Sequence, residues 1–330
     1  MRSERSSEIQ SGATVKKASS SSRSPGYRDT TFGDGGIVDT PIPGSGAGVY
    51  GAALTGDGHI VAAGAAERKG DGGTTSDGVI ARYSAGGALD GTFGDGGLAF
   101  VNFNPPERVI FGQVAVLPDG HVLALGAARS SPSSSEYLIA KFNPNGSLDA
   151  TFGAGGIVRH SNVLYAMALQ PDGKIVAAGS SFQAGRTDLS AIRLHANGSL
   201  EPSFGAAGRV VLVLTPESRA YAVTVDGTGR IVLGGGISAP APAKEDFALL
   251  RLMSTGALDA TFASGGIVST NLGADDWILG LHIQPDGKYL TAGVSIKSGP
   301  TAVSDALARF LSDGTPARIR HRRKGRRAES

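Results

Sequence analysis

The chain has 330 residues, no cysteine, 50 glycines and a formal net charge of +2. Without cysteine, disulfide bonds and thiolate metal sites are excluded, and a hydrophobic content of 40% is too high for a disordered chain. Both ends are basic. The remaining body, residues 27–316, carries 19 basic and 26 acidic side chains, which argues against a nucleic-acid-binding body.

The first segment, residues 1–26, is rich in Ser and Arg, and we expect it to be disordered. It lacks the apolar run of roughly 7–15 residues that a signal peptide requires. No window of the chain reaches the ~18 apolar residues of a membrane helix. The chain as written shows no export signal; export by another route and a truncated start are the alternatives.

The body, residues 27–316, repeats one unit five times, and three motifs recur in register. The first is a turn such as TTFGDGGIV, with its phenylalanine at Phe32, Phe93, Phe152, Phe204 and Phe262. The second is a hairpin such as PDGKIVAAG, closed by Gly64, Gly126, Gly179, Gly235 and Gly293. The third is a strand that ends in a basic residue: Arg82, Lys141, Arg193, Arg251 and Arg309.

Each unit predicts four short antiparallel strands separated by glycine-rich turns. In the third unit the expected strands are residues 165–170, 174–179, 189–194 and 209–214. A four-stranded unit at this period is typical of a propeller blade. The sequence therefore predicts an all-β fold, a five-bladed β-propeller of four-stranded antiparallel blades.

The two ends of the body are complementary parts of one unit. The body begins with the end of a unit, DTTFGDGGIV, and finishes with the start of one, LARFLSDGT. Pairing an N-terminal strand with the C-terminal strands would complete the fifth blade and remove open sheet edges. We therefore expect the ring to be closed in this way, and the protein to be a monomer.

The three motifs resemble the delta-60 repeat, a bacterial β-propeller family, over residues 28–315. The resemblance rests on the PDGK(I/V)VAAG hairpin, the (A/L)R(Y/F) strand and the LDxTFGxGG turn. It implies a propeller fold and a location at the cell envelope or outside the cell, with no established activity. The chain departs from the pattern at residues 227–229, where PDG is lost, and at Ala263.

Positions that recur in every unit are interpreted as structural. The phenylalanines should fill the space between blades. The carboxylate three residues before each should cap the turn and pair with the basic residue of the third motif. Three tyrosines that share one place in the repeat are interpreted as core: Tyr50, Tyr165 and Tyr221. Zinc-binding histidine spacings, nucleotide loops and the GxSxG motif are absent from the sequence.

Loops that vary between units are the expected binding site, because a rigid scaffold commonly presents function on such loops. By strand alternation, the loops between second and third strands and the connections between blades share one face, here called the variable-loop face. Trp277, the only tryptophan, follows Asp275 and Asp276 in a connection and could hold a cation or a sugar. Arg108 lies in another connection on this face.

An acidic residue near the start of each third strand gives a further candidate site: Asp77, Glu136, Asp188, Asp246 and Asp305. These carboxylates could form a ring that attracts a hard cation such as Ca²⁺, although repetition favours a structural role. No other cofactor is expected.

We expect a non-catalytic binding or scaffold module that recognises a protein or carbohydrate on the variable-loop face. The alternatives are a propeller enzyme of the lyase or hydrolase type and a purely structural cell-surface protein. Residues 317–330 form a basic tail that we expect to be disordered. Nucleic acid or an anionic surface would bind only through this tail.

Overall fold

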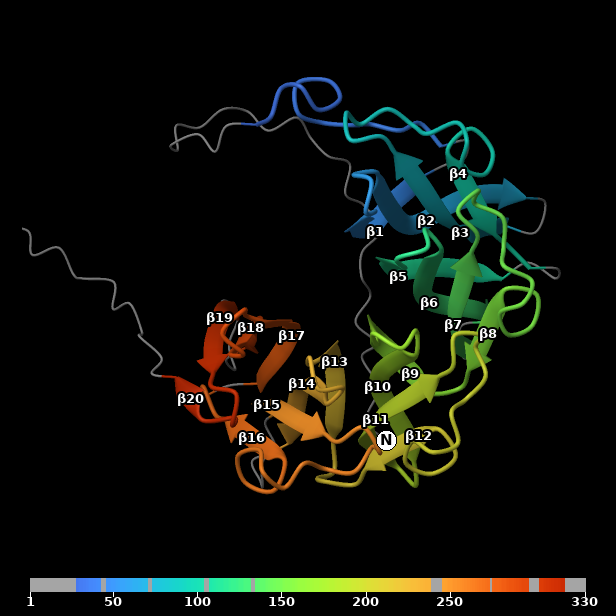
Figure 1. The fold of residues 1–330 in the computed structure, drawn as a ribbon. Coiled ribbons are helices and arrows are strands. Elements are labelled where there is room, and N and C mark those ends of the chain that lie inside the picture. The colour runs from blue at the N-terminus through green and yellow to red at the C-terminus, as the bar shows by residue number, and fades with distance from the viewer. Residues whose placement is uncertain are drawn as a thin grey trace, which may run out of the picture.

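The computed structural model describes residues 28–42, 46–70, 73–103, 107–131, 134–238, 245–273, 275–296 and 303–317. In these residues, twenty strands form five antiparallel sheets of four strands each (Figure 1), which confirms the predicted fold class. None of the described residues belongs to a helix that could span a bilayer. The segments expected to be disordered, residues 1–26 and 317–330, lie outside the described residues apart from Ala317.

The five sheets follow one another along the chain and are numbered here as blades 1 to 5. Blade 1 contains β1 (Gly46–Leu54), β2 (Ile60–Gly70), β3 (Gly73–Tyr83) and β4 (Leu98–Val101). Blade 2 contains β5 (Arg108–Val116), β6 (Val122–Ser131), β7 (Ser134–Phe142) and β8 (Ile157–His160). Blade 3 contains β9 (Val163–Leu169), β10 (Ile175–Gln183), β11 (Arg186–Leu194) and β12 (Arg209–Leu212). Blade 4 contains β13 (Ser218–Val225), β14 (Ile231–Ser238), β15 (Glu245–Leu252) and β16 (Ile267–Thr270). Blade 5 contains β17 (Asp275–Ile283), β18 (Tyr289–Ile296), β19 (Val303–Phe310) and β20 (Pro316–Ala317).

Each sheet is a meander, so its turns alternate between two faces of the molecule. In blade 3 the strands run in the order β9, β10, β11 and β12 across the sheet. The β10–β11 hairpin is longer than expected and continues to Gln183 and Arg186, because Ala184 and Gly185 turn the chain with φ of 50° and 76°. The strand order places the PDG and TFG turns on one face and the variable loops on the other, as the repeat predicts.

The joints between blades are built by the repeated turn. Four phenylalanines of this turn are fully buried: Phe93, Phe152, Phe204 and Phe262. At the blade 2–blade 3 joint, the Gly153 N–H donates to the Asn197 carbonyl at 2.8 Å. Asp149 accepts the Thr151 N–H at 3.0 Å and pairs with Lys141 at 2.9 Å. The predicted capping and pairing of these carboxylates is therefore confirmed at this joint.

Every innermost strand carries a β-bulge at the same place in the repeat. The residues that the strand pairing skips are Tyr50, Gly112, Tyr165, Tyr221 and Leu279. The bulge explains the glycine that closes each hairpin motif. A Cβ on Gly179 would lie 1.9 Å from the Val163 carbonyl oxygen, and one on Gly235 would lie 1.8 Å from that of Arg219. Only glycine fits opposite the bulge.

The bulge overturns one sequence interpretation. Tyr50 and Tyr165, expected in the core, are exposed over 56% and 40% of their surface, and Tyr221 is half-buried. A bulged residue does not alternate with its neighbours, so its side chain leaves the packed interface between blades. These tyrosines lie on the inner strands and not in the core.

The expected closure of the ring is not seen in the described residues. Figure 1 shows blade 1 and blade 5 separated by a gap, whereas consecutive blades lie side by side. The fourth strand of blade 5 is the two-residue β20, and residues 28–42 pair with no strand of that blade. These residues form the turn Thr31–Gly36 beside blade 1, where the Gly33 N–H donates to the Gly86 carbonyl.

Candidate functional site

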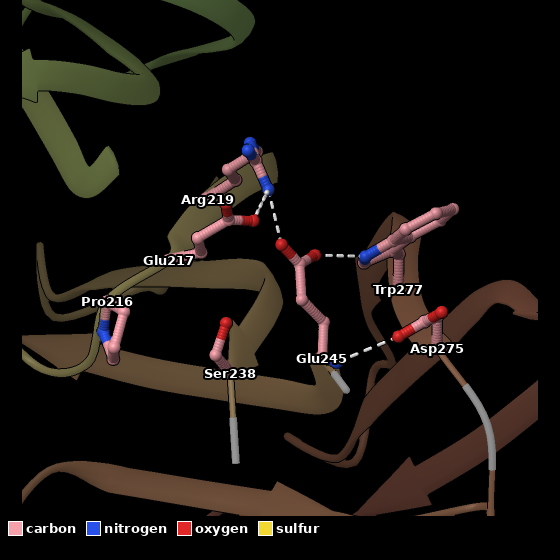
Figure 2. Close-up of a pocket in the computed structure, with 7 residues that line it drawn as sticks. All are labelled: Pro216, Glu217, Arg219, Ser238, Glu245, Asp275 and Trp277. Atoms are coloured by element: carbon pink, nitrogen blue, oxygen red, sulfur yellow. Dashed lines mark hydrogen bonds and ion pairs between the residues drawn. The ribbon is translucent and has the colours of Figure 1, made fainter. Parts of the chain in front are cut away.

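A cavity of about 400 Å³ opens on the variable-loop face where blade 4 meets blade 5. Figure 2 shows the seven residues that line it, which come from the connection before blade 4, from β13, β14 and β15, and from the start of β17: Pro216, Glu217, Arg219, Ser238, Glu245, Asp275 and Trp277. The cavity therefore lies on the face that the sequence singled out.

Glu245 is the centre of this cavity. Its side chain is buried, and its two carboxylate oxygens accept hydrogen bonds from different neighbours: the Arg219 guanidinium donates to Oε1 and the Trp277 indole N–H donates to Oε2 (Figure 2). The Asp275 carboxylate accepts the backbone N–H of Glu245 at 3.2 Å. Arg219 also reaches Glu217 at 3.3 Å. The trio Arg219, Glu245 and Trp277 is thus held in one geometry.

The electrostatics of the cavity favour positive charge. Burial raises the pKa of the Glu245 carboxyl group; the guanidinium of Arg219 and the Trp277 hydrogen bond oppose that rise. The lining holds three carboxylates and a single guanidinium, so at neutral pH it carries an excess of negative charge. An anionic ligand would be repelled there, whereas a cation would be attracted.

The repeat explains why the trio forms at one joint. Arg219 and Trp277 occupy the same place in consecutive units, two residues before the bulge. The other units have Gly48, Ile110 and Val163 there. Glu245 pairs with Ser238 across its hairpin, at a place where the other units carry Ser76, Ser135, Thr187 and Val303. Three departures from the repeat therefore meet in space.

A second cavity, of about 310 Å³, lies between the innermost strands. Four bulge residues line it: Gly112, Tyr165, Tyr221 and Leu279. The ring centroids of Tyr165 and Tyr221 are 4.8 Å apart, and those of Tyr221 and Trp277 are 6.4 Å apart. Burial and the Glu245 charge raise the pKa of the Tyr221 hydroxyl. A row of aromatic rings therefore leads from the inner strands to the first cavity, the one lined by Trp277 and called the Trp277 cavity below.

Of the four residues predicted as a binding site in the connections between blades, two line the cavity and two do not. Trp277 and Asp275 line the cavity, although Trp277 is half-buried in strand β17 and not part of a loop. Asp276 points the other way, because side chains alternate along a strand. It is fully buried and accepts the Leu272 N–H at 2.7 Å, so it caps the connection between blades. Arg108 is exposed on β5 in blade 2 and does not line the cavity.

The five acidic residues proposed as a cation ring are not brought together. Glu136 pairs with Arg159 at 2.8 Å, Asp188 pairs with Arg186 at 2.6 Å, and Asp246 accepts a hydrogen bond from Asn271. Asp77 is buried and Asp305 is exposed. In the part of the chain that the structure describes, no group of three or more His, Cys, Asp or Glu side chains could hold a metal ion. The structure gives no support to a Ca²⁺ site at these residues.

Sequence reasoning missed Arg219, Glu245 and Tyr221. A signal for Glu245 was present, since it directly precedes the repeated acidic residue Asp246 and has no counterpart in other units. Aligning the units position by position would also have marked Arg219 and Trp277 as exceptions at one position. What the alignment could not show is that the three side chains share a cavity.

Solved structures with similar folds are distant. A gluconolactonase from Xanthomonas campestris is 14% identical, with a TM-score of 0.41, over 74% of this chain and 69% of its own. A protein of unknown function from Dyadobacter fermentans is 12% identical, with a TM-score of 0.47, over 81% of this chain and 77% of its own. The protein Sqt1 from Chaetomium thermophilum is 12% identical, with a TM-score of 0.41, over 82% of this chain and 70% of its own. At this distance the similarities carry no functional argument.

A family of repeats matches the chain itself. The family is described as a domain of unknown function, the DUF5122 β-propeller. Its model matches five segments, one in each unit: residues 55–93, 117–152, 170–204, 227–262 and 284–316. The match confirms a β-propeller repeat family, but it does not carry the narrower delta-60 name. No curated protein matches significantly. The matched segments cover more than half of the chain, which therefore belongs to the DUF5122 β-propeller family.

Proposed function

We propose that this protein is a non-catalytic binding module that takes a cationic group of its ligand or protein partner into the Trp277 cavity. The observation that carries the proposal is the trio Arg219, Glu245 and Trp277, which breaks the five-fold repeat on the variable-loop face. A specific ligand needs such a departure, because the repeated positions present the same surface in every blade.

The chemistry of the cavity supports a cation as the bound group. Aromatic rings attract ammonium and guanidinium groups through their electron-rich faces, and tryptophan does so best. The Trp277 ring lines the same cavity as the carboxylates of Glu217 and Asp275, which add Coulombic attraction. The acidic body would steer a basic partner towards this face.

Binding accounts for Glu245 better than catalysis does. A general acid must present its proton to the substrate. Both Glu245 oxygens instead accept hydrogen bonds from within the protein, from Arg219 and Trp277. We therefore assign Glu245 to positioning the indole and guanidinium, which fixes the shape of the cavity. A propeller hydrolase with Glu245 as proton donor is the competing function.

Fluorescence of the single tryptophan tests the proposal without a label. Titration with choline and with a short oligolysine peptide should shift the emission, and added salt should weaken the response. Trp277→Ala should reduce affinity for the same probe, measured by calorimetry, by about tenfold, in line with a cation–π contribution of roughly 0.5–2 kcal/mol. Phe182→Ala is the matched control, because Phe182 is an exposed aromatic residue at the β10–β11 hairpin outside the cavity.

Two outcomes would contradict the proposal. If choline and oligolysine bind equally well to wild type and Trp277→Ala, the site is elsewhere. If neutral oligosaccharides bind and the cationic probes do not, the cavity recognises sugars. Turnover of a glycoside substrate that disappears in Glu245→Gln would establish the competing hydrolase.

A further inference from the structure

We infer that the Trp277 cavity and the second cavity form one site for an extended peptide. A Lys or Arg side chain of the peptide enters the Trp277 cavity, and a large apolar side chain two residues away enters the second cavity. This inference rests on the proposed function for its cationic half and adds the class of partner. Three observations carry it: the strands that the cavities share, the aromatic rings between them and the different charge of their linings.

The two cavities follow one another along the same two inner strands. Strand β13 supplies Arg219 to the Trp277 cavity (Figure 2) and Tyr221 to the second cavity. Strand β17 supplies Trp277 and Leu279 to them in the same order. In each strand the two residues are two positions apart, which corresponds to roughly 6–7 Å, and alternate side chains of an extended peptide have the same spacing. A peptide that lies along β13 and β17 can therefore place residues i and i+2 in the two cavities.

Tyr221 lies at the boundary of the two cavities. Its ring centroid is 6.4 Å from that of Trp277 in the first cavity and 4.8 Å from that of Tyr165 in the second. Burial and the Glu245 charge raise the pKa of the Tyr221 hydroxyl, and the Arg219 guanidinium lowers it. The hydroxyl therefore lies within the field of the first cavity, while the same residue lines the second cavity.

The second cavity differs from the first in charge, because every residue that lines it is uncharged. Its one carboxamide, Gln113, is already engaged: Nε2 donates to the Met167 carbonyl at 3.1 Å, and Oε1 accepts the Met167 N–H at 2.6 Å. Leu279 and Tyr165 are exposed over 51% and 40% of their surface, so apolar surface faces solvent there. An apolar surface beside an acidic cavity matches a partner that carries an apolar group next to a cationic one.

The β-bulges favour a peptide over other molecules that join a cation to an apolar group. Four residues that the strand pairing skips line the second cavity: Gly112, Tyr165, Tyr221 and Leu279. A bulged residue stays outside the ladder of its sheet, so its backbone groups can pair with another chain. The backbone of an extended peptide carries the matching donors and acceptors. Backbone pairing at the bulges would hold the peptide along the inner strands, and the two cavities would select its side chains.

Two pentapeptides of identical composition test the spacing. GKGLG places its lysine and leucine two residues apart, whereas GGKLG places them on neighbouring residues, whose side chains point to opposite sides of an extended chain. Both peptides are acetylated at the N-terminus and amidated at the C-terminus, so that lysine carries the one charge. Calorimetry with the full-length protein should show about tenfold tighter binding of GKGLG, because it buries one more large apolar side chain. Equal affinities would overturn the inference.

Leu279→Ser separates the two halves of the site. Leu279 lines the second cavity and is 51% exposed, so the variant should keep its fold, which a thermal melt checks. The preference for GKGLG over GGKLG should disappear, while choline should still shift the Trp277 emission. Leu54→Ser is the matched control, because Leu54 is an exposed leucine at the end of β1 that lines neither cavity. A preference that survives Leu279→Ser, or that Leu54→Ser also removes, would contradict the two-cavity site.

Hexylammonium tests the part played by the peptide backbone, because it joins a cation to an apolar chain without any amide group. It should bind more weakly than GKGLG, and equal or tighter binding would mean that the site takes cationic amphiphiles and not peptides. Choline separates this inference from the proposed function. If choline binds to the wild type but GKGLG has no advantage over GGKLG, the proposed function stands and the peptide site is wrong. If choline does not bind, the Trp277 cavity is not a cation site, and both are wrong.

Discussion

The same three kinds of side chain, an arginine, a carboxylate and an aromatic ring, meet in two regions of this protein with different consequences. On the face that carries the PDG and TFG turns, here called the turn face, Arg251 stacks on Phe262 with its guanidinium carbon 4.6 Å from the ring centroid, and it pairs with Asp259 at 2.8 Å. On the variable-loop face, Arg219, Glu245 and Trp277 meet beside an open cavity. The first trio recurs, for example as Arg82, Asp90 and Phe93, whereas the second occurs at one joint.

The difference between these regions lies in repetition and burial. A contact that recurs at successive joints holds neighbouring blades together, and its aromatic ring is fully buried. A contact that breaks the repeat leaves its ring half-buried, where a ligand can reach it. Residue type alone does not distinguish the two; repetition and burial do.

The largest expected loss of stability comes from a substitution on the turn face. Phe152→Ala removes a fully buried ring and should lower the free energy of unfolding by roughly 3–5 kcal/mol. Chemical denaturation of the purified variant measures this loss. Trp277→Ala should cost clearly less, because the Trp277 ring is only half-buried. Equal losses would mean that the tryptophan is as structural as the phenylalanine, and the comparison between the two faces would fail.

The second-largest expected loss of stability tests the glycine that lies opposite the β-bulge in each blade. Gly179→Ala places a Cβ against the Val163 carbonyl and should destabilise the protein by roughly 1–3 kcal/mol. Gly112→Ala is the matched control, since Gly112 is itself the bulged residue of blade 2 and a Cβ there meets nothing within 4 Å. Thermal melts of both variants check the contrast. If Gly112→Ala is as harmful as Gly179→Ala, the clash does not explain the repeated glycine.

The smallest expected effect is the dependence of stability on pH, which should have opposite sign for a carboxyl group on each face. Hydrogen bonds from Thr151 and Lys141 lower the pKa of Asp149 to about 2. The stability that Asp149 adds is present above its unfolded pKa of 3.8 and is lost as the pH falls towards 2. Burial raises the pKa of Glu245, so its contribution is fully present below its unfolded pKa of 4.5 and declines as the pH rises above that value.

Urea melts across pH 2–7 measure both trends. The stability difference between wild type and Asp149→Asn should grow as the pH rises from about 2 to about 4. The difference between wild type and Glu245→Gln should shrink as the pH rises past about 4.5. Parallel trends for the two variants would show that both carboxylates have the same role.

Much of the architecture follows from the sequence by itself. The turn motif recurs five times, which sets five units, and the hairpin and strand motifs set four strands in each. The capping and pairing of Asp149 were also predictable, because these contacts lie within a few residues of one another along the chain. Local turn chemistry and short-range pairing leave a direct record in a repeated sequence.

Only the tertiary structure decided where the tyrosines and the site residues lie. A bulge shifts Tyr50, Tyr165 and Tyr221 out of the alternation on which their assignment to the core relied. The cavity unites Glu217 and Arg219 with Asp275 and Trp277 from the next unit, and the hairpin of blade 4 adds Glu245. Contacts between units depend on how the blades pack, and a one-residue offset reverses the direction of a strand side chain, as it does for Asp276. The repeat determined the scaffold, and the packing of blade 4 against blade 5 decided which exceptions to the repeat share a cavity.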